Sequence, residues 1–345
     1  MHIGVGMDYE IVATLGPASE SAELWGKMLA CGASAFRLNT SHFDLDRIHA
    51  WLKRLMPFLA VWDTRVPLVL DLQGSKWRLG NFEKRVLEQG QALELVHASS
   101  AGHPDALPVP HADFFQAAAE SSGEVVLDDA RISLVVTSIG AGRLGVRVIK
   151  GGEIAPRKGI TYTASGFRSE RLSPKDQAIL EQTRSIPGIR YAISYVRDAQ
   201  EMARYRAQCG PSAYLIAKLE RGPAIDDAPS IAAVSNELWL CRGDLGAELG
   251  SRAMAAAVHR FSQRLAGLPV PVMLAGQVLE HMTGHAHPTR SEVCYLHDAL
   301  TRGYRGVVLS DETAMGLYPV EVCGAASQFR GQTRAENDER QPVAL

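Results

Sequence analysis

The chain has 345 residues, which at about 150 residues per domain corresponds to roughly two domains, or to one large barrel with an insertion. Its 36 basic and 38 acidic residues leave a net charge of −2, without a long run of like charges. This pattern excludes the electrostatic footprint of a nucleic-acid binder or a polybasic membrane binder. We therefore expect small-molecule partners, no nucleic acid and no membrane.

The cysteines and the start of the chain indicate the compartment. No apolar stretch reaches the ~18 residues of a transmembrane helix, and the opening MHIGVGMDYE lacks the features of a signal peptide. The five cysteines are scattered and form no CxxC pair, which favours reduced thiols over disulfides or zinc ligands. We expect a cytoplasmic protein. The sequence leaves its oligomeric state open, and a homo-oligomer is compatible with it.

Short apolar runs with helical segments between them predict parallel strands joined by crossover helices. Eight such runs predict an α/β fold of the (β/α)₈ TIM-barrel type, whose active site lies at the carboxyl ends of the strands. In chain order they are 11–16, 35–39, 67–72, 191–196, 213–220, 237–244, 271–276 and 306–311.

Helices are expected after most of these strands. The first has Ser19 as its predicted N-cap, and another begins at Ser173 with Pro174 in its first turn. The predicted helices span 19–30, 44–55, 173–183, 198–206, 251–265, 289–301 and 319–330.

Between the third and fourth strands the alternation of strand and helix stops. Residues 81–163 carry short alternating segments such as QALELV and LGVRVIKG, broken by glycine and proline. We expect a small inserted β domain, a β-barrel lid after the third strand. The expected domains are the first part of the barrel (1–80), the lid (81–163) and the second part of the barrel (164–345).

Two neighbouring strands end in charged residues that a purely structural strand would not need. Lys218 and Glu220 are two residues apart and share one face of a strand, and Asp244 ends the next run after a glycine. Two carboxylates can hold a hard divalent cation, and the lysine can neutralise a phosphoryl group or an enolate. The alternative is an ion-pair network at the barrel rim. Their place at carboxyl strand ends favours the site.

Polar residues also follow the second and third strands. Arg37 is suited to a phosphate or a carboxylate. A site shared between the barrel and the insertion would suit a lid that closes over substrate. The polar residues at these two strand ends are Arg37, Asn39, Ser41, His42, Asp71, Lys76 and Arg78.

The motifs in this order resemble the pyruvate kinase family. The segments AKLER, RGDLG and PTRSE are the most specific, and further matches include IVATLGPAS, FRLNTSH, LDLQGSKWRLG, AISYVR and SDETAMG. Together they span residues from about 10 to 325, insertion included. The resemblance implies a phosphotransferase that moves the phosphoryl group of phosphoenolpyruvate to ADP, with Mg²⁺ or Mn²⁺ as cofactor.

The resemblance also implies roles for individual residues. Lys218 and Arg37 would stabilise the transferring phosphoryl group, and Glu220 and Asp244 would bind the divalent metal. The substrate would lie against Gly243, Asp244, Gly276 and Ser194. The nucleotide side would comprise Pro17, Asn39, His42, Arg78 and Lys158. The region around the monovalent cation would comprise Asn39, Ser41, Asp71, Leu72 and Lys76.

The sequence departs from the family pattern at several positions. Gly276 replaces a threonine that contacts substrate in the family. Potassium-dependent relatives have glutamate at the position of Lys76 and threonine at that of Leu72, so we expect a fixed ammonium to replace K⁺ and an oxygen ligand to be lost. The C-terminal effector domain of many relatives is expected to be absent.

These departures leave alternatives open. One is a metal-dependent aldolase or lyase acting through a pyruvate enolate. Others are a paralogue with a modified enolpyruvyl substrate or low activity, and a catalytically silent regulatory protein. The family's reaction remains our principal expectation, with K⁺ not required.

Overall fold

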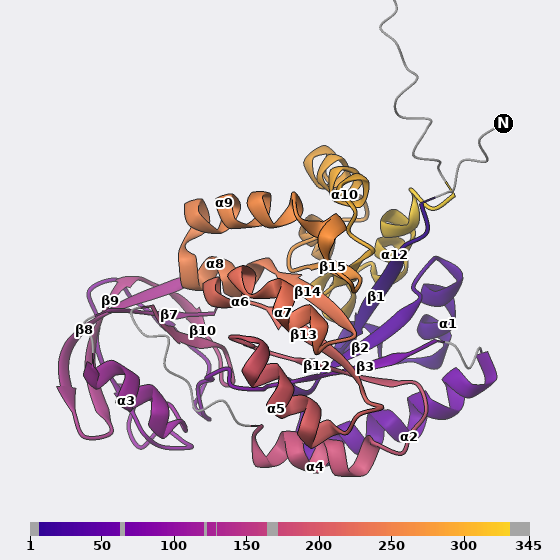
Figure 1. The fold of residues 1–345 in the computed structure, drawn as a ribbon. Coiled ribbons are helices and arrows are strands. Elements are labelled where there is room, and N and C mark those ends of the chain that lie inside the picture. Colours follow the sequence, from indigo (N-terminus) through magenta and orange to yellow (C-terminus); the bar gives the residue numbers. More distant parts are fainter. Residues whose placement is uncertain (1–6, 63–65, 121–122, 129, 164–171, 332–345) are drawn as a thin grey trace, which may run out of the picture.

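The computed structural model describes residues 7–62, 66–120, 123–128, 130–163 and 172–331. Eight parallel strands close into a barrel at its centre, with the order β1-β16-β15-β14-β13-β12-β3-β2 (Figure 1). This confirms the predicted TIM-barrel fold. The strands are β1 (Glu10–Leu15), β2 (Ala35–Asn39), β3 (Leu68–Leu72), β12 (Ile189–Ile193), β13 (Tyr214–Leu219), β14 (Glu237–Cys241), β15 (Val272–Ala275) and β16 (Gly306–Leu309).

Helices surround the barrel because each has an apolar face that packs against the outward side of the strands. The longer ones are α1 (Ala22–Ala30), α2 (Leu45–Trp62), α4 (Pro174–Thr183), α5 (Ala199–Cys209), α9 (Ser251–Ser262), α10 (Arg290–Arg302) and α12 (Pro319–Ser327). The shorter ones are α6 (Gly222–Asp226), α7 (Ala228–Ala233), α8 (Arg242–Leu249) and α11 (Asp311–Ala314), with 3₁₀ turns η1 (Pro17–Ser19), η2 (Thr40–His42), η3 (Leu265–Gly267) and η4 (Glu280–Thr283). In the described part of the chain, no helix combines the length and apolarity needed to cross a membrane.

Several predicted boundaries are wrong. The helix expected over 44–55 continues to Trp62, for example. Ser19 is not the N-cap of α1, because its hydroxyl instead accepts from the backbone N–H of Gly16 within η1. Ser21 caps the helix by accepting from Leu24 N. The sixth strand ends at Cys241 rather than at Asp244, since the chain turns into α8 at Arg242.

Alternation along the strands produces two separate cores. Residues such as Ile11, Leu70 and Leu238 face outward and pack under the helices. The inward core is filled by Val12, Ala35, Val69, Ala192, Ile216, Trp239, Cys241, Met273, Ala275 and Val308. The barrel interior is therefore packed solid, and a ligand has access only at its end.

The insertion leaves the barrel after β3 and returns before β12, and these two strands pair directly, with Asp71 opposite Ala192. Its strands form a six-stranded sheet of order β11-β7-β8-β9-β5-β6 and a two-stranded sheet β10-β4, with a core of their own. The elements are β4 (Arg85–Leu87), β5 (Ala92–Val96), β6 (Ala106–Pro108), α3 (Ala112–Glu120), β7 (Glu124–Leu127), β8 (Ile132–Gly140), β9 (Arg143–Lys150), β10 (Gly152–Ile154) and β11 (Ile160–Tyr162). The insertion lies to one side of the barrel (Figure 1).

Candidate active site

The inward-facing side chains become polar toward the carboxyl ends of the strands. Val12, Ala35 and Val69 belong to the interior core, as do Ala192 and Ile216. Because every second residue of a strand faces the same side, the residues two positions further on must also face inward. These residues are Thr14, Arg37, Asp71, Ser194 and Lys218, and all five are buried. The alternation of the strands therefore builds one buried polar layer above the apolar core.

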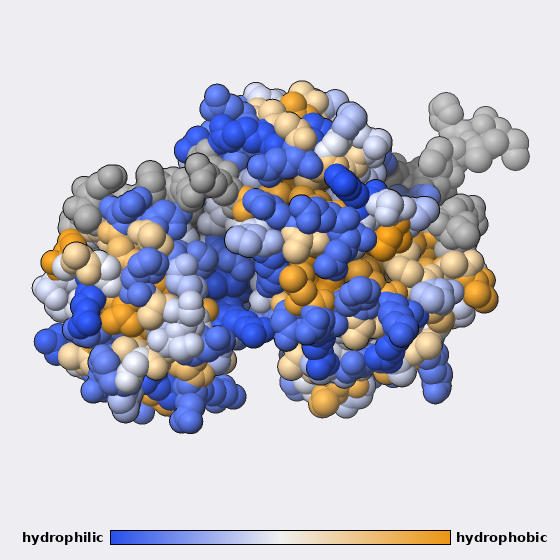
Figure 2. Space-filling view, turned by 90° about the horizontal axis from the view of Figure 1, so that it is seen from below, coloured by the Kyte–Doolittle hydropathy of each residue, from blue (hydrophilic) through white to orange (hydrophobic). Residues whose placement is uncertain are grey.

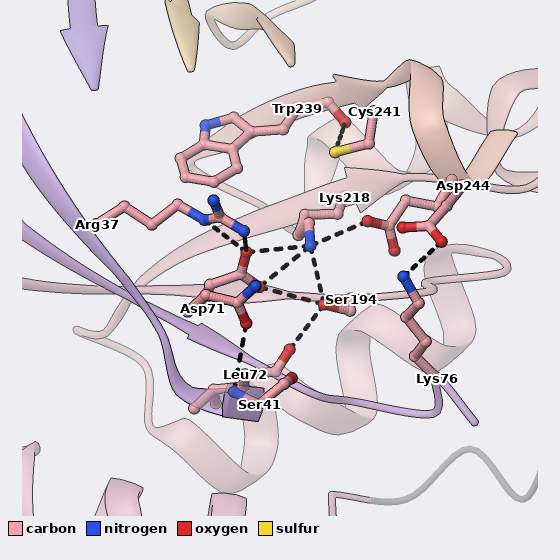
Figure 3. A network of polar contacts seen from close by, with 12 residues as sticks. Arg37, Ser41, Asp71, Leu72, Lys76, Ser194, Lys218, Trp239, Cys241 and Asp244 are labelled. Carbon is pink, nitrogen blue, oxygen red and sulfur yellow. Dashed lines mark hydrogen bonds and ion pairs between the residues drawn. The ribbon is translucent and has the colours of Figure 1, made fainter. Parts of the chain in front are cut away.

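Asp71 is the centre of this layer (Figure 3). The guanidinium of Arg37 donates to its Oδ2 atom, with the Nε and Nη2 atoms at 2.8 and 2.6 Å. The Lys218 Nζ atom lies 3.2 and 3.1 Å from its Oδ1 and Oδ2 atoms. Arg37 also donates to Thr14 Oγ1 at 2.8 Å. One carboxylate thus fixes two cations side by side, which is the arrangement needed to bind an anionic group.

Ser194 ties Lys218 to the third strand. Its hydroxyl lies 3.0 Å from Lys218 Nζ, 3.1 Å from Asp71 Oδ1 and 2.8 Å from the carbonyl oxygen of Leu72 (Figure 3). The side chain of Leu72 faces the opposite way and packs under the helices. A side chain at position 72 therefore points away from the polar layer. A threonine there would not place its hydroxyl in this layer, so the structure does not support the expected loss of an oxygen ligand at Leu72.

Glu220 and Asp244 are the two carboxylates next to Lys218. Glu220 Oε1 lies 2.9 Å from Lys218 Nζ, and Glu220 Oε2 accepts from the backbone N–H of Tyr195 at 2.7 Å. Oε1 is buried and has no hydrogen bond of good geometry in the described structure. Asp244 lies in the first turn of α8, with one carboxylate oxygen 2.5 Å from Lys76 Nζ. The Glu220 Oε1 atom therefore has lone pairs available to a further cation.

The pKa values in this layer follow from burial and close charges. Burial raises the pKa of Asp71, but Lys218 and Arg37 outweigh it and hold that pKa below its ordinary value. Burial lowers the pKa of Lys218, but Asp71 and Glu220 outweigh it and raise that pKa well above its ordinary value. Burial raises the pKa of Glu220 to about 7, and the negative charge of Asp244 adds to the effect despite Lys218. An added divalent cation would relieve that repulsion.

Lys76 reaches Asp244 because hydrogen bonds and a close backbone contact fix the conformation of the loop that precedes Lys76. Gly74 has φ +57°, and a Cβ there would lie 2.3 Å from the carbonyl oxygen of Ser194. The carboxylate of Asp176 accepts from the backbone N–H groups of Gln73 and Gly74, both at 3.2 Å. Because only glycine fits this close approach, the loop is set in one conformation and directs Lys76 to α8.

Gly276 lies at the carboxyl end of β15, beside the start of α8. Its φ is +82°, and a Cβ would lie 3.1 Å from the backbone nitrogen of Gly243. The guanidinium of Arg242 donates to the carbonyl oxygens of Gly276 and Gln277, with Nε 3.0 Å and Nη2 2.8 Å away respectively. Gly276 and Gly243 are therefore neighbours, as a shared substrate subsite requires.

The residues expected on the nucleotide side meet where the insertion approaches the barrel. Arg78 donates to the carbonyl oxygen of Arg157 at 2.9 Å, and Arg157 donates to that of His42 at 3.2 Å. Lys158 pairs with Asp128 at 2.9 Å. Desolvation by the surrounding protein and the charges of Arg78 and Lys158 lower the pKa of His42 well below its ordinary value, although the residue is exposed at the surface. Figure 2 shows a notch between the insertion and the barrel, with hydrophilic residues at its base.

The remaining expected residues lie at the same end of the barrel with local roles. Pro17 begins η1 directly after β1. Asn39 caps η2, since its Oδ1 atom accepts from Ser41 N at 3.3 Å. Ser41 is buried in that turn. Lys76 pairs with Asp244, a residue outside the group expected around the monovalent cation.

Sequence reasoning missed three residues that support the site. Thr14 accepts from Arg37, and Tyr195 donates its backbone N–H to Glu220. Glu312 is buried, and its Oε1 atom accepts from the backbone N–H groups of Val278 and Leu279 at 3.1 and 3.2 Å. The position of Thr14, two residues after an inward valine, is a signal that could have identified it. The other two make hydrogen bonds that involve backbone N–H groups, their own or those of distant residues, for which the sequence carries no direct signal.

Comparisons with known proteins show the family of the chain. The family model described as pyruvate kinase, barrel domain, matches residues 7–323. A pyruvate kinase of Methylorubrum extorquens is 31% identical over 329 residues, which cover 95% of this chain and 69% of the relative. A pyruvate kinase of Agrobacterium vitis is 33% identical over 322 residues, which cover 90% of this chain and 65% of the relative.

A solved structure supports the fold. A crystal structure of a pyruvate kinase from Cryptosporidium parvum superposes with a TM-score of 0.79 at 24% identity, covering 93% of this chain and 68% of that one. The chain thus spans roughly two thirds of the length of these relatives. Because the family model matches most of the chain and curated relatives share about 30% of its residues, the chain belongs to the pyruvate kinase family of phosphotransferases.

Proposed function

We propose that this protein transfers the phosphoryl group of phosphoenolpyruvate to ADP, giving pyruvate and ATP. The observation that carries the proposal is the pairing of Arg37 and Lys218 on Asp71, directly beside Glu220 and near Asp244. These groups lie at or just beyond the carboxyl ends of the barrel strands, where barrel enzymes carry their chemistry. We also propose a cytoplasmic location, where ADP and ATP are available.

The two carboxylates fit a divalent cation. Glu220 offers a buried oxygen without a hydrogen bond of good geometry, and burial together with the negative charge of Asp244 raises the pKa of Glu220. Within the described residues there is no cluster of three or more ligating side chains. Glu220 and Asp244 would therefore hold Mg²⁺ or Mn²⁺ together with oxygens from substrate and water. When bound, the cation would neutralise charge on the phosphoryl oxygens.

Arg37 and Lys218 would act on the transferring group. Both are buried, charged and fixed by Asp71, so they need no reorganisation when negative charge develops. Lys218 would face the phosphoryl group and the enolate, and Arg37 the phosphoryl group alone. Catalysis would consist of positioning and charge neutralisation. The backbone N–H groups of Gly243 and Asp244, at the start of α8, would hold the substrate carboxylate.

We propose that the insertion, residues 81–163, acts as the lid that brings the nucleotide into line. Lys158 of the insertion and Arg78, just before the insertion begins, supply positive charge at the notch, and His42 is held neutral on the barrel side. A nucleoside diphosphate is an anion that this environment would attract. The barrel would then comprise residues 1–80 and 164–345.

Potassium is not required in the proposed reaction. Lys76 provides a fixed, buried ammonium in the site, where its charge faces Asp244. Because this positive charge belongs to the protein itself, no K⁺ ion has to bind to supply it.

Gly276 favours a second candidate, an enolpyruvyl substrate bulkier than phosphoenolpyruvate. The family's threonine is absent here, and the left-handed backbone of Gly276 brings it close to Gly243 without a side chain between them. The candidate rests on the missing threonine side chain itself, since the close approach of Gly276 to Gly243 leaves little room even for a Cβ at this position.

Purified protein with Mg²⁺ is the material for the test. Pyruvate and ATP are measured after adding phosphoenolpyruvate with and without ADP, and aldol cleavage is assayed in parallel. The proposal predicts pyruvate formation that requires ADP and matches ATP one to one. Pyruvate formation without ADP, or aldol cleavage alone, would assign the site to a different enzyme class. If phosphoenolpyruvate undergoes neither reaction, the result favours the bulkier enolpyruvyl substrate.

A further inference from the structure

Tyr195 has a backbone conformation that is unusual for its type. It lies just after β12, its side chain is fully buried, and its φ is +64°. A bulky residue in the left-handed region is uncommon and strained, so the surrounding contacts must hold it there.

Those contacts join three parts of the site. The backbone N–H of Tyr195 donates to Glu220 Oε2 at 2.7 Å, and its carbonyl oxygen accepts from Ser75 Oγ at 3.3 Å. The left-handed turn directs the N–H to Glu220 while Ser194, one residue earlier, faces Lys218. The backbone of Tyr195 therefore orients one oxygen of the proposed metal ligand.

The side chain of Tyr195 reaches the insertion. Its hydroxyl lies 3.0 Å from Thr161 Oγ1 in β11, and both residues are buried. β11 also packs against α8, the helix that carries Asp244. A hydroxyl pair shielded from water loses its bond without compensation when one partner is removed. The contact thus ties the position of β11 to the position of the Tyr195 ring.

We propose that Tyr195 is a positioning residue that couples docking of the insertion to the orientation of Glu220. The inference rests on the proposed function, in which Glu220 holds the divalent cation. The rigid ring fixes the separation between the hydroxyl and the backbone N–H of one residue. A displacement of β11 is therefore transmitted to Glu220 Oε2 through one side chain. The substrate-side chemistry needs no contact with Tyr195 itself.

A second buried tyrosine, four residues earlier, offers a matched control. Tyr191 lies in β12, and its hydroxyl is 2.8 Å from Thr183 Oγ1 in α4. This tyrosine and threonine pair has the same chemistry but faces a barrel helix rather than the insertion. Tyr191→Phe removes a similar hydrogen bond without touching Glu220.

The experiment measures Mn²⁺ binding to the whole 345-residue chain by titration calorimetry, without substrates. The variants are Tyr195→Phe, Thr161→Val, the double variant, Tyr191→Phe and Glu220→Gln. Thermal unfolding of each is recorded alongside. We expect Tyr195→Phe and Thr161→Val each to weaken Mn²⁺ binding about three- to tenfold, the effect of one buried hydrogen bond. The double variant should be no weaker than either single variant, since both remove the same contact.

The controls separate the inference from the proposed function. Tyr191→Phe should lower the unfolding temperature while leaving Mn²⁺ affinity unchanged. If Glu220→Gln abolishes Mn²⁺ binding but Tyr195→Phe binds as Tyr191→Phe does, the coupling is wrong and the metal site stands. If Glu220→Gln binds Mn²⁺ as tightly as the unsubstituted protein, the proposed metal site is wrong and the coupling is overturned with it. Additive losses in the double variant would also contradict the coupling.

Discussion

The ammonium of Lys76 lies 2.5 Å from Oδ1 of Asp244, in a pair whose two side chains are almost entirely buried. The pair joins the loop before the insertion to the first turn of α8. Burial alone would raise the pKa of Asp244, but Lys76 and Lys218 outweigh it and lower that pKa to about 2. A positive charge is therefore built into the site beside the carboxylate proposed to bind the divalent cation.

This pair leads to the first prediction, potassium independence. In buffer free of sodium and potassium, added K⁺ should change the rate of phosphoenolpyruvate-dependent ATP formation by less than about twofold, because the fixed ammonium supplies the charge. Lys76→Met should lower the rate and make it rise on addition of K⁺. Strong K⁺ stimulation of the unsubstituted protein would refute this explanation.

The second prediction concerns the divalent cation. Glu220→Gln and Asp244→Asn should each weaken Mn²⁺ binding by about tenfold or more, because each removes one of two charged ligands. Calorimetric titration measures the affinity. Glu237→Gln is the matched control, since Glu237 is a buried carboxylate at the opposite end of the same barrel. Equal affinities in all three variants would place the cation elsewhere.

The third prediction uses the pKa of Glu237. Burial and the negative charge of Glu10 raise this pKa from 4.5 to about 7, even though Trp239 and Tyr214 donate to the carboxylate. Between these pH values the folded state holds a proton that the unfolded state releases, so the contribution to stability falls as pH rises through about 7. Relative to Glu237→Gln, the protein should lose about 2–3 kcal/mol between pH 4.5 and pH 8.

Urea unfolding at a series of pH values checks this prediction. The difference in unfolding free energy between the two proteins is the informative quantity, because other titrating groups cancel. A constant difference over the whole range would show that Glu237 titrates normally in the folded protein.

The fourth prediction concerns Gly276. The sequence alone leaves two outcomes for Gly276→Thr: higher phosphoryl transfer through a restored hydroxyl, or a steric loss of a native activity. The structure favours loss, because φ is +82° and a Cβ would lie 3.1 Å from Gly243 N. Gly276→Ala and Gly276→Thr should both destabilise the protein by about 1 kcal/mol or more and lower its turnover.

Gly210 provides the control. Its φ is +96°, but a Cβ at this position would meet no atom within 4 Å among the described residues, and Gly210 caps α5 away from the site. Gly210→Ala should lose similar stability through backbone strain and keep full activity. Higher turnover in Gly276→Thr would show instead that the loop adapts and that the missing hydroxyl limits the reaction.

The sequence predicted the barrel and most of the polar layer because both depend on local periodicity. The spacing of Lys218 and Glu220 places them on one face of β13 and its extension, and the structure confirms their proximity. Asp244 was expected at a strand end, yet it lies in a helix, because a glycine-containing run also permits a helical turn.

The rest depends on contacts between distant segments. The direction of Lys76 depends on Asp176, which holds Gln73 and Gly74 from 102 or more residues away. The hydroxyl pair of Tyr195 and Thr161 joins residues 34 apart in the chain, one just after barrel strand β12 and the other in β11 of the insertion. Periodicity and motif spacing carry no information on such contacts, so only the folded structure reveals them.

The most direct test of the central claim is ³¹P NMR of the purified protein with phosphoenolpyruvate, ADP and Mg²⁺. The proposed site predicts that the phosphoenolpyruvate resonance declines while the γ-phosphate resonance of ATP grows by the same amount, and that Asp244→Asn abolishes both changes. Growth of inorganic phosphate without ATP, or equal transfer by Asp244→Asn, would contradict the account.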